Sequence, residues 1–330
     1  YYCVQESRPN GETMKGVVLD LKSIDNGDID LAKLKAVIRN CQTYDSTLDT
    51  DVVSRISNAD IVITNKVKLQ KSHLELAPKL KLICIAATGT NNVDLDTAVK
   101  AGITVANVTN YATPSVVEHV FCLILALTRK LNQYQTAVRD DRWQKSPFFC
   151  LLDYSISELA GKTLGIIGFG VLGKAVAKLA EALGMQVLIA ARKGGKPKHG
   201  RTALEELLTK SDVVSLHCPL TPETQGLIGV KELALMKPSA ILINTARGGI
   251  VDEKALFNAI QSQSIAGAGV DVLGEEPPKY GNPLLDTQLP NLIVTPHIAW
   301  ASVESRQRVV DEIAENIIAF QNGMPRNVVC

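Results

Sequence analysis

The sequence predicts an α/β protein of two doubly wound parallel-sheet domains with a cleft between them. Short apolar runs alternate with helical patterns in two series, one before residue 110 and one after Gly161, as is typical of parallel strands covered by helices. The chain has 330 residues, 46% hydrophobic and 21% charged, so it can form two cores. We expect one domain to comprise residues 14–112 and 299–330, and the other residues 113–298.

The first thirteen residues, YYCVQESRPNGET, are expected to lie outside the fold as a non-native tail or upstream sequence. They lack the charged, apolar and small-residue regions of a signal peptide. After Met14 the first series begins. Its predicted strands are GVVLDL (16–21), ADIVITN (59–65), LKLICIAAT (80–88) and ITVANV (103–108). Apolar positions three and four residues apart predict a helix over residues 28–40.

Two long helices are predicted where the chain passes between the domains. After the turn cluster that ends at Pro114, residues 115–130 are apolar almost all round, which is typical of a helix buried between domains. Residues 302–322 form an amphipathic pattern that we expect to return the chain to the first domain. The second series of predicted strands comprises residues 163–168, 186–191, 212–218, 240–246, 266–273 and 291–296.

Charge and cysteine usage exclude several classes of function. A formal net charge of +1 without long runs of like charge argues against nucleic-acid or membrane partners. The seven cysteines are scattered, without the spacing of metal ligands, so we expect reduced thiols, a cytoplasmic protein and no metal. No apolar run approaches the ~20 residues of a membrane span.

A glycine motif opens the second series. Gly168, Gly170 and Gly173 form GxGxxG directly after a predicted strand and before a helical pattern, which is the context of a dinucleotide-binding βαβ unit. The first glycine allows a tight turn, the second lets the backbone approach a pyrophosphate, and the third lets the helix pack closely on the strand. The alternative is a strand-to-helix turn that binds no ligand.

The next strand ends in cations where an NAD site usually has a carboxylate. That position falls at or beside Ala191, followed by Arg192 and Lys193. The two cations can donate charge-assisted hydrogen bonds to a 2′-phosphate, so we predict a preference for NADPH, with NADH possible. The alternative is that both are solvated and that either cofactor serves.

Three further residues follow strands of the second series. Arg247 lies in INTARGGIVDE, Glu276 in AGVDVLGEEPP and His297 in IVTPHIAW. Because the carboxyl ends of parallel strands meet at one edge, we expect them to converge. Arginine can hold a carboxylate bidentately, and histidine can exchange a proton when a carboxylate fixes its other ring nitrogen. Together with a nicotinamide, this set can reduce a 2-keto acid.

These segments, with GxGxxG upstream, resemble the signatures of the D-isomer-specific 2-hydroxyacid dehydrogenases, in particular the glycerate dehydrogenase or hydroxypyruvate reductase branch, over Met14 to Val329. The resemblance implies a Rossmann cofactor domain and a flavodoxin-like substrate domain. It implies catalytic roles for Arg247, Glu276 and His297. It also implies substrate contacts near Thr88 and Gly89, in a loop with asparagine at 91 and 92 where many relatives have aspartate.

Further expectations accompany the resemblance. It implies a homodimer, with Trp143 to Tyr154 at the interface. Besides the glycines and cations already named, the expected cofactor contacts are Val171, Leu172, Cys218, Pro219, Thr245, Ala246, Asp271 and Thr113.

Other functions remain open at this point. A lactate-type or 3-phosphoglycerate dehydrogenase would share every catalytic residue. Lys66 is a candidate phosphate contact, but a solvated lysine is the favoured interpretation. A non-catalytic dinucleotide sensor, similar to some transcriptional corepressors, is a further alternative. The complete arginine, glutamate and histidine set argues against it.

Overall fold

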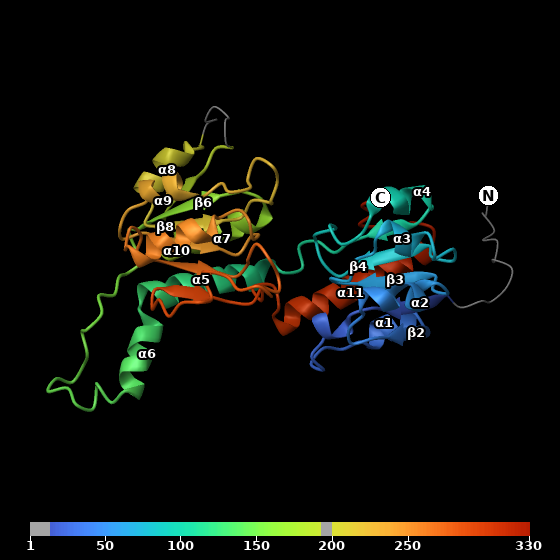
Figure 1. Ribbon diagram of the computed structural model, residues 1–330, viewed down its shortest axis with the longest axis horizontal. Helices are drawn as coiled ribbons and strands as arrows, with labels where there is room; N and C mark the ends of the chain where they lie inside the picture. The colour runs from blue at the N-terminus through green and yellow to red at the C-terminus, as the bar shows by residue number, and fades with distance from the viewer. Residues whose placement is uncertain (1–13, 193–199) are drawn as a thin grey trace. The chain divides into compact units, whose positions relative to one another are not determined.

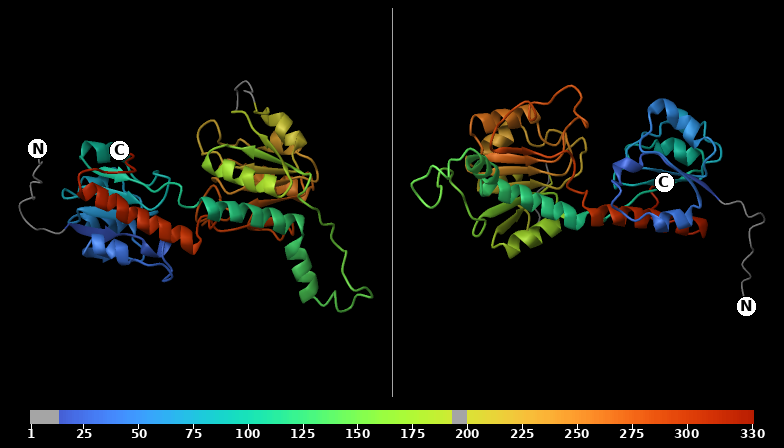
Figure 2. Two further views of the ribbon diagram at one scale, coloured as in Figure 1. Left: turned by 180° about the vertical axis from the view of Figure 1, so that it is seen from behind. Right: turned by 90° about the horizontal axis from the view of Figure 1, so that it is seen from below.

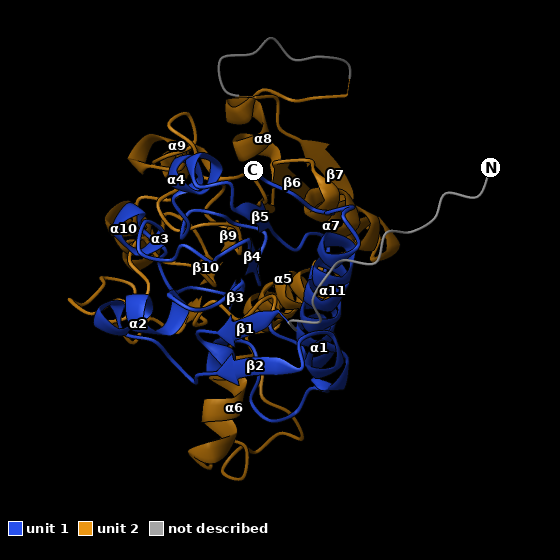
Figure 3. Ribbon diagram, turned by 90° about the vertical axis from the view of Figure 1, so that its right-hand side faces the viewer, with its two compact units in different colours: residues 1–112, 301–330 blue, residues 113–300 orange. Residues whose placement is uncertain are grey.

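The computed structural model describes residues 14–192 and 200–330, and these form two compact α/β units (Figure 1). The first unit contains residues up to Ala112 together with Ala301–Cys330, and the second contains Thr113–Trp300 (Figure 3). Each unit has one parallel sheet, which confirms the predicted fold class.

The sheet of the first unit has the order β2-β1-β3-β4-β5 (Figure 3). Its strands are β1 (Lys15–Val18), β2 (Asn40–Thr43), β3 (Ile61–Thr64), β4 (Leu82–Ile85) and β5 (Thr104–Ala106). One face is covered by α1 (Ala32–Val37) and α11 (Val303–Gln321), and the other by α2 (Val52–Ile56), α3 (Lys71–Leu74) and α4 (Leu95–Lys100). Short 3₁₀ turns are η1 (Leu21–Ser23) and η2 (Asp49–Asp51).

The end of the chain is held to the first unit. The amide of Val105 donates to the carbonyl of Cys330, and the amide of Val329 donates to that of Val105, so the last residues extend the sheet beyond β5. The helix α11 begins after Ser302, whose side chain accepts the amide of Ser305 as an N-cap.

The predicted helix over residues 28–40 is shorter in the structure. The chain forms α1 only from Ala32 to Val37 and then enters the edge strand β2, which the apolar pattern did not indicate. The sequence of β2, NCQT, is largely exposed, so it lacks the buried apolar run by which the other strands were found.

The sheet of the second unit has the order β11-β10-β9-β8-β6-β7. Its strands are β6 (Thr163–Ile167), β7 (Gln186–Ile189), β8 (Val213–Leu216), β9 (Ile241–Asn244), β10 (Gly267–Val270) and β11 (Leu292–Val294). Its helices are α5 (Thr113–Thr128), α6 (Leu131–Arg139), α7 (Val171–Ala182), α8 (Leu204–Lys210), α9 (Val230–Leu235) and α10 (Glu253–Gln261).

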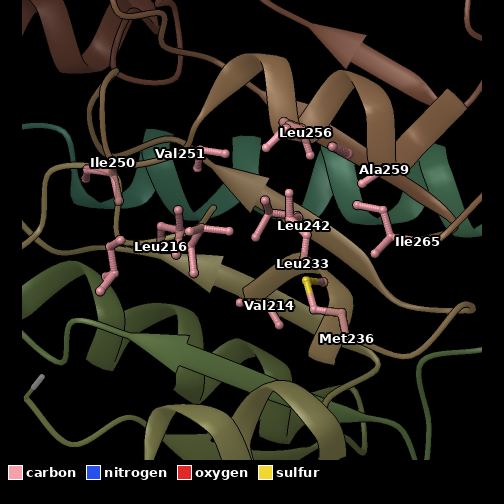
Figure 4. Packing of buried hydrophobic residues seen from close by; sticks show 14 of the residues in the cluster. Val214, Leu216, Leu233, Met236, Leu242, Ile250, Val251, Leu256, Ala259 and Ile265 are labelled. Atoms are coloured by element: carbon pink, nitrogen blue, oxygen red, sulfur yellow. The ribbon is translucent and has the colours of Figure 1, made fainter. Parts of the chain in front are cut away.

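The core of the second unit lies on both faces of this sheet. On one face, side chains of α8, α9 and α10 pack against β8 and β9, as Leu233, Leu242 and Leu256 illustrate (Figure 4). On the other face α5 packs against β9, β10 and α7. At Gly269 of β10 a Cβ atom would lie 2.9 Å from Cβ of Leu123, so α5 lies directly on the strand.

The helix α6 and the segment that follows it extend away from the sheet of their own unit (Figure 2). This arm is held by Tyr134, whose hydroxyl donates to the carbonyl of Tyr154 at 2.7 Å. An ion pair between Arg142 and Asp153 closes it further. Several large apolar side chains of the arm are nevertheless exposed, among them Phe148 at 72%, Phe149 at 91% and Leu152 at 83%.

Candidate functional site

The glycine motif forms a cradle between β6 and α7 that fits a dinucleotide. Gly168 has φ +100°, and a Cβ there would lie 2.5 Å from the amide nitrogen of Cys218, which follows the neighbouring strand β8. A Cβ at Gly173 would lie 2.1 Å from the carbonyl oxygen of Gly168. Around a Cβ at Gly170 no heavy atom lies within 4 Å. Gly168 and Gly173 thus permit close packing. Gly170 instead leaves open space in which a pyrophosphate can approach the start of α7 at Val171 and Leu172.

Buried polar atoms at the same edge support this fit. His217 Nδ1 and Thr245 Oγ1 are buried and, within the described part of the chain, have no hydrogen-bond partner. Burial lowers the pKa of His217 to about 4, so its ring is neutral at pH 7. Cys218 and Pro219 follow β8, and Ala246 follows β9, where its amide donates to Asn244 Oδ1 at 3.1 Å. Burial raises the pKa of the Cys218 thiol, which disfavours the thiolate.

Of the two cations predicted near the end of β7, the structure describes one. Arg192 is exposed and lies three residues after Ile189, the last residue of the strand, whereas Lys193 lies outside the described residues. The chain returns at Thr202, which forms a parallel bridge with Ala190, and this places Arg201 at the same end of the sheet. The guanidinium of Arg201 lies 5.2 Å from the ring centroid of Phe169 in the glycine motif, and its Nη1 donates to the carbonyl of Ala190 at 3.3 Å.

Sequence reasoning missed Arg201 because it considered only the residues that end the strand. The available signal was the composition of RKGGKPKHGR, residues 192–201, which contains five lysines and arginines and no acidic residue.

Arg247 lies on the loop after β9, which is pressed against the loop after β10. A Cβ at Gly248 would lie 1.8 Å from the carbonyl oxygen of Leu273, so only glycine permits this approach. The side chain of Arg247 is exposed, and its Nη1 donates to the carbonyl of Ala246 at 2.7 Å. The carbonyl of Arg247 accepts from the side-chain amide of Asn244 at 3.0 Å, which fixes the loop to the end of its strand.

Glu276 and His297 form a direct pair. Glu276 Oε2 lies 2.6 Å from His297 Nδ1, and Glu276 Oε1 accepts the amide of Leu273 at 2.9 Å. The two side chains remain 36% and 29% exposed, so the pair is accessible to a substrate. Glu253 of α10 supports the loop by accepting the amide of Gly274 at 2.6 Å. The structure therefore brings together two of the three residues predicted as catalytic and places Arg247 on the adjoining loop.

Asp271, predicted as a cofactor contact, is 1% exposed, and its carboxylate is used inside the unit. It accepts the hydroxyl of Thr295 at 2.5 Å and the amides of Ile298 and Ala299 at 2.9 Å each. The carboxylate thus holds the segment that carries His297. Thr113, a further predicted contact, is the first residue of α5. The cofactor contacts of both residues stay predictions.

The predicted substrate loop lies in the first unit. The hydroxyl of Thr88 donates to the carbonyl of Val108 at 2.9 Å, and Gly89 follows it. Asn92 turns its side-chain amide to the carbonyl of Val67 at 3.2 Å, so this asparagine anchors the loop after β3. Lys66 is exposed, and its amide donates to Asp20.

An open pocket of about 650 Å³ lies on the first unit, with Lys68, Lys71 and Asn91 among its lining residues. The later part of the predicted substrate loop, Asn91 to Asp94, lines this pocket, whereas Thr88 and Gly89 do not. Its lining also includes Glu75 and Asp94, and this mixture of charges specifies no ligand.

These loops place the second unit among the nicotinamide-dependent oxidoreductases, because the cradle accepts a dinucleotide and the paired histidine can exchange a proton with a substrate. The sequence profile of the D-isomer specific 2-hydroxyacid dehydrogenases, NAD binding domain, matches residues 121–299. The chain belongs to this family and is therefore an enzyme that interconverts 2-keto acids and D-2-hydroxy acids.

Several known proteins are similar over nearly the whole chain. The glycerate dehydrogenase of Methylorubrum extorquens is 49% identical over 324 residues, covering 96% of this chain and 99% of that protein. The hydroxypyruvate reductase of Blautia hydrogenotrophica is 41% identical over 323 residues, with the same coverage of 96% and 99%. The structure of an acyclic imino acid reductase in complex with NADPH and D-Arg has a TM-score of 0.82 at 30% identity, covering 96% of this chain and 100% of that one.

Among the described residues, no helix has both the length and the apolar character that crossing a membrane requires. In the same part of the chain, no three His, Cys, Asp or Glu side chains gather in a way that could hold a metal ion.

Proposed function

We propose that the chain reduces hydroxypyruvate, and also glyoxylate, to the corresponding 2-hydroxy acids, with NADPH as the favoured cofactor. The observation that carries this proposal is the 2.6 Å contact between Glu276 and His297 at the edge that holds the glycine cradle. The names of the two relatives, a glycerate dehydrogenase and a hydroxypyruvate reductase, support the choice of substrate.

Each polar residue has a distinct role in this proposal. Arg247 holds the substrate carboxylate with its guanidinium fork. The substrate contacts of Thr88 and Gly89 in the first unit stay predictions. Glu276 accepts a hydrogen bond from Nδ1–H of His297, and Nε2–H of the protonated ring donates its proton to the carbonyl oxygen. The bound nicotinamide supplies the hydride that the carbonyl carbon receives.

The grip of Arg247 can be tested by its fork geometry. Lysine at this position keeps the charge but replaces two parallel donors by a point charge, so Arg247→Lys is expected to lower kcat/KM for hydroxypyruvate by ~10²-fold. A wild-type kcat/KM in Arg247→Lys would contradict a bidentate contact.

The proposed preference for NADPH rests on Arg192 and Arg201 at the end of β7. Arg201 is already held by Phe169 and by the carbonyl of Ala190, so little side-chain entropy is lost when it meets a 2′-phosphate. No carboxylate follows β7 at residues 190–192 to repel that phosphate.

The test is a kinetic panel of hydroxypyruvate, glyoxylate, pyruvate and phosphohydroxypyruvate with both reduced cofactors. We expect the highest kcat/KM for hydroxypyruvate with NADPH. Arg192→Ala and Arg201→Gln should each lower kcat/KM for NADPH by ~10-fold or more and leave that for NADH within ~2-fold. Arg129→Ala, an exposed arginine at the end of α5, is the matched control.

Titration with adenosine 2′,5′-bisphosphate and with AMP separates cofactor recognition from turnover. The wild type should bind the bisphosphate more tightly, and Arg201→Gln should reduce that difference. Equal affinities in the wild type, or equal kcat/KM for the two cofactors, would refute the preference.

We also propose a homodimer formed through the arm. The segment after α6 exposes four large apolar side chains within ten residues, and such a concentration is typical of an interaction surface. They are Trp143 at 52%, Phe148, Phe149 and Leu152. Light scattering should give a dimer mass for the wild type and a monomer for a Phe149→Asp, Leu152→Asp double variant. A wild-type monomer at micromolar concentration would contradict the proposal.

A further inference from the structure

The carboxylate of Asp271 organises the segment that carries His297. Its oxygens accept the amides of Ile298 and Ala299, which directly follow the histidine, and its backbone carbonyl accepts the amide of His297 itself at 2.8 Å. A carboxylate buried to 1% exposure requires such donors, because an unpaired buried charge is strongly disfavoured. The conformation of the segment therefore depends on where this carboxylate lies.

The segment needs this support because His297 has φ +56°, in the left-handed region that residues other than glycine seldom occupy. Such a backbone persists only when its surroundings fix it. In the same segment Trp300 Nε1 donates to the carbonyl of His297 at 3.0 Å. Small displacements of Asp271 would thus be transmitted to the imidazole and to its contact with Glu276.

A second histidine, His119 of α5, reaches this carboxylate through Thr295. His119 Nε2 lies 3.0 Å from Thr295 Oγ1 and 3.6 Å from Asp271 Oδ1. The hydroxyl of Thr295 donates its only proton to Asp271, so the hydrogen bond from His119 must be donated by Nε2–H. The order of donors is therefore fixed, from His119 to Thr295 and from Thr295 to Asp271.

The packing of α5 holds His119 in place. Leu123, one turn later on the same helix, lies against Gly269 of β10, where a Cβ would be only 2.9 Å from Cβ of Leu123. Because Asp271 directly follows β10, this close approach brings the histidine to the end of the strand. His119 is 17% exposed, so its hydrogen bond is largely shielded from water.

We propose that His119 is a positioning residue for the reaction, acting through the hydroxyl of Thr295 and the carboxylate of Asp271 to fix the segment that carries His297. This inference rests on the proposed role of His297 as proton donor. It assigns to α5 a catalytic contribution although His119 does not itself touch the reacting groups.

The experiment compares substitutions that remove a donor with substitutions that restore it. His119→Phe keeps a ring but removes the donor, and Thr295→Val keeps the shape but removes the hydroxyl. Each is expected to lower kcat for hydroxypyruvate by ~10-fold, the effect of losing about one hydrogen bond, while KM for NADPH stays within ~2-fold. His119→Gln and Thr295→Ser should recover kcat to within ~3-fold of the wild type.

A double variant and a control test the connection between the two residues. His119→Phe with Thr295→Val should be no slower than Thr295→Val alone, because both changes break the same path. Thr128→Val is the matched control on α5, since its hydroxyl donates only within the helix, and it should leave kcat unchanged.

A readout that does not depend on turnover is the ¹⁵N chemical shifts of the His297 imidazole, which report its hydrogen bond to Glu276. These shifts should change in His119→Phe and return in His119→Gln. Wild-type kcat with unchanged shifts in His119→Phe would overturn the inference, as would a loss confined to KM for NADPH. Full activity in His297→Ala would instead show that the proposed function is wrong.

Discussion

The two sheets share a strand order but differ at the point where that order reverses. In each sheet the first strand lies between the second and the third, as β2-β1-β3 in the first unit and β7-β6-β8 in the second. In the first unit this point is filled by Asp20, which is 5% exposed and accepts the amides of Asn65 and Lys66 at 2.9 and 2.7 Å. In the second unit the corresponding loop carries the glycine motif.

This difference teaches that topology provides the backbone donors and that side chains decide whether a ligand can use them. In the first unit a carboxylate of the chain itself takes the donors. In the second unit Gly170 leaves the space open, with no heavy atom within 4 Å of a Cβ at that position.

The prediction with the largest expected effect tests whether the reduction depends on residues at the end of the second sheet. His297→Ala removes the proposed proton donor, and kcat for hydroxypyruvate should fall by ~10²–10⁴-fold. The affinity for NADPH, measured by fluorescence titration, should change little because the cradle is untouched. Turnover near that of the wild type would show that the proton comes from another group.

A pair of glycine substitutions separates packing from ligand access. At Gly173 a Cβ would collide with the carbonyl of Gly168 at 2.1 Å, so Gly173→Ala should lower the free energy of unfolding by ~3 kcal/mol. Gly170→Ala should keep the wild-type melting temperature but bind NADPH at least ~10-fold more weakly. The prediction is contradicted if Gly170→Ala binds NADPH as the wild type does.

The converse experiment removes the Asp20 carboxylate, so that the first unit resembles the second at this point. Asp20→Ala leaves the amides of Asn65 and Lys66 without their acceptor, which should lower the free energy of unfolding by ~2–3 kcal/mol. Those amides then become available to anions, so phosphate should raise the melting temperature of Asp20→Ala more than that of the wild type. Identical responses to phosphate would show that backbone donors at this point do not suffice.

The smallest expected effect is on the free energy of unfolding; it is nearly absent at pH 7 and increases as the pH falls. Burial lowers the pKa of His217 to about 4, whereas an unfolded histidine has a pKa of about 6.5. Below pH 6.5 the unfolded state binds the proton first, so this residue makes the free energy of unfolding fall as the pH drops, by about 2 kcal/mol at pH 5 and about 3 kcal/mol at pH 4. Urea unfolding of the wild type and of His217→Asn at pH 7 and pH 5 should show the smaller loss in the variant.

The sequence predicted those features of the fold and site whose signals lie within a few consecutive residues. The apolar runs of the buried strands and the glycine motif are each recognisable within a few consecutive residues. The structure confirms the fold that these local patterns predicted. The edge strand β2 was missed because NCQT has no apolar pattern. Glu276 and His297 were paired correctly because their motifs follow neighbouring strands of one parallel sheet.

The contacts of Asp271 and His119 had no local signal. Asp271 meets its donors 24 to 28 residues further along the chain, and His119 meets Thr295 across 176 residues. The contact of His119 arises from the packing of α5 on β10, which no spacing rule predicts. Arg201 was missed for a similar reason, because it returns to the end of β7 only through the bridge between Ala190 and Thr202.

That bridge also bears on how cofactor choice can change in evolution. Ala191 donates to the carbonyl of Thr202, and Thr202 donates to that of Ile189, so both ends of the basic stretch are joined by main-chain bonds that any sequence can make. Residues 192–201 can therefore be replaced together without displacing β7 or α8. Under the proposed role of Arg192 and Arg201, replacing this stretch would change the choice of nicotinamide cofactor independently of the residues that perform the reduction.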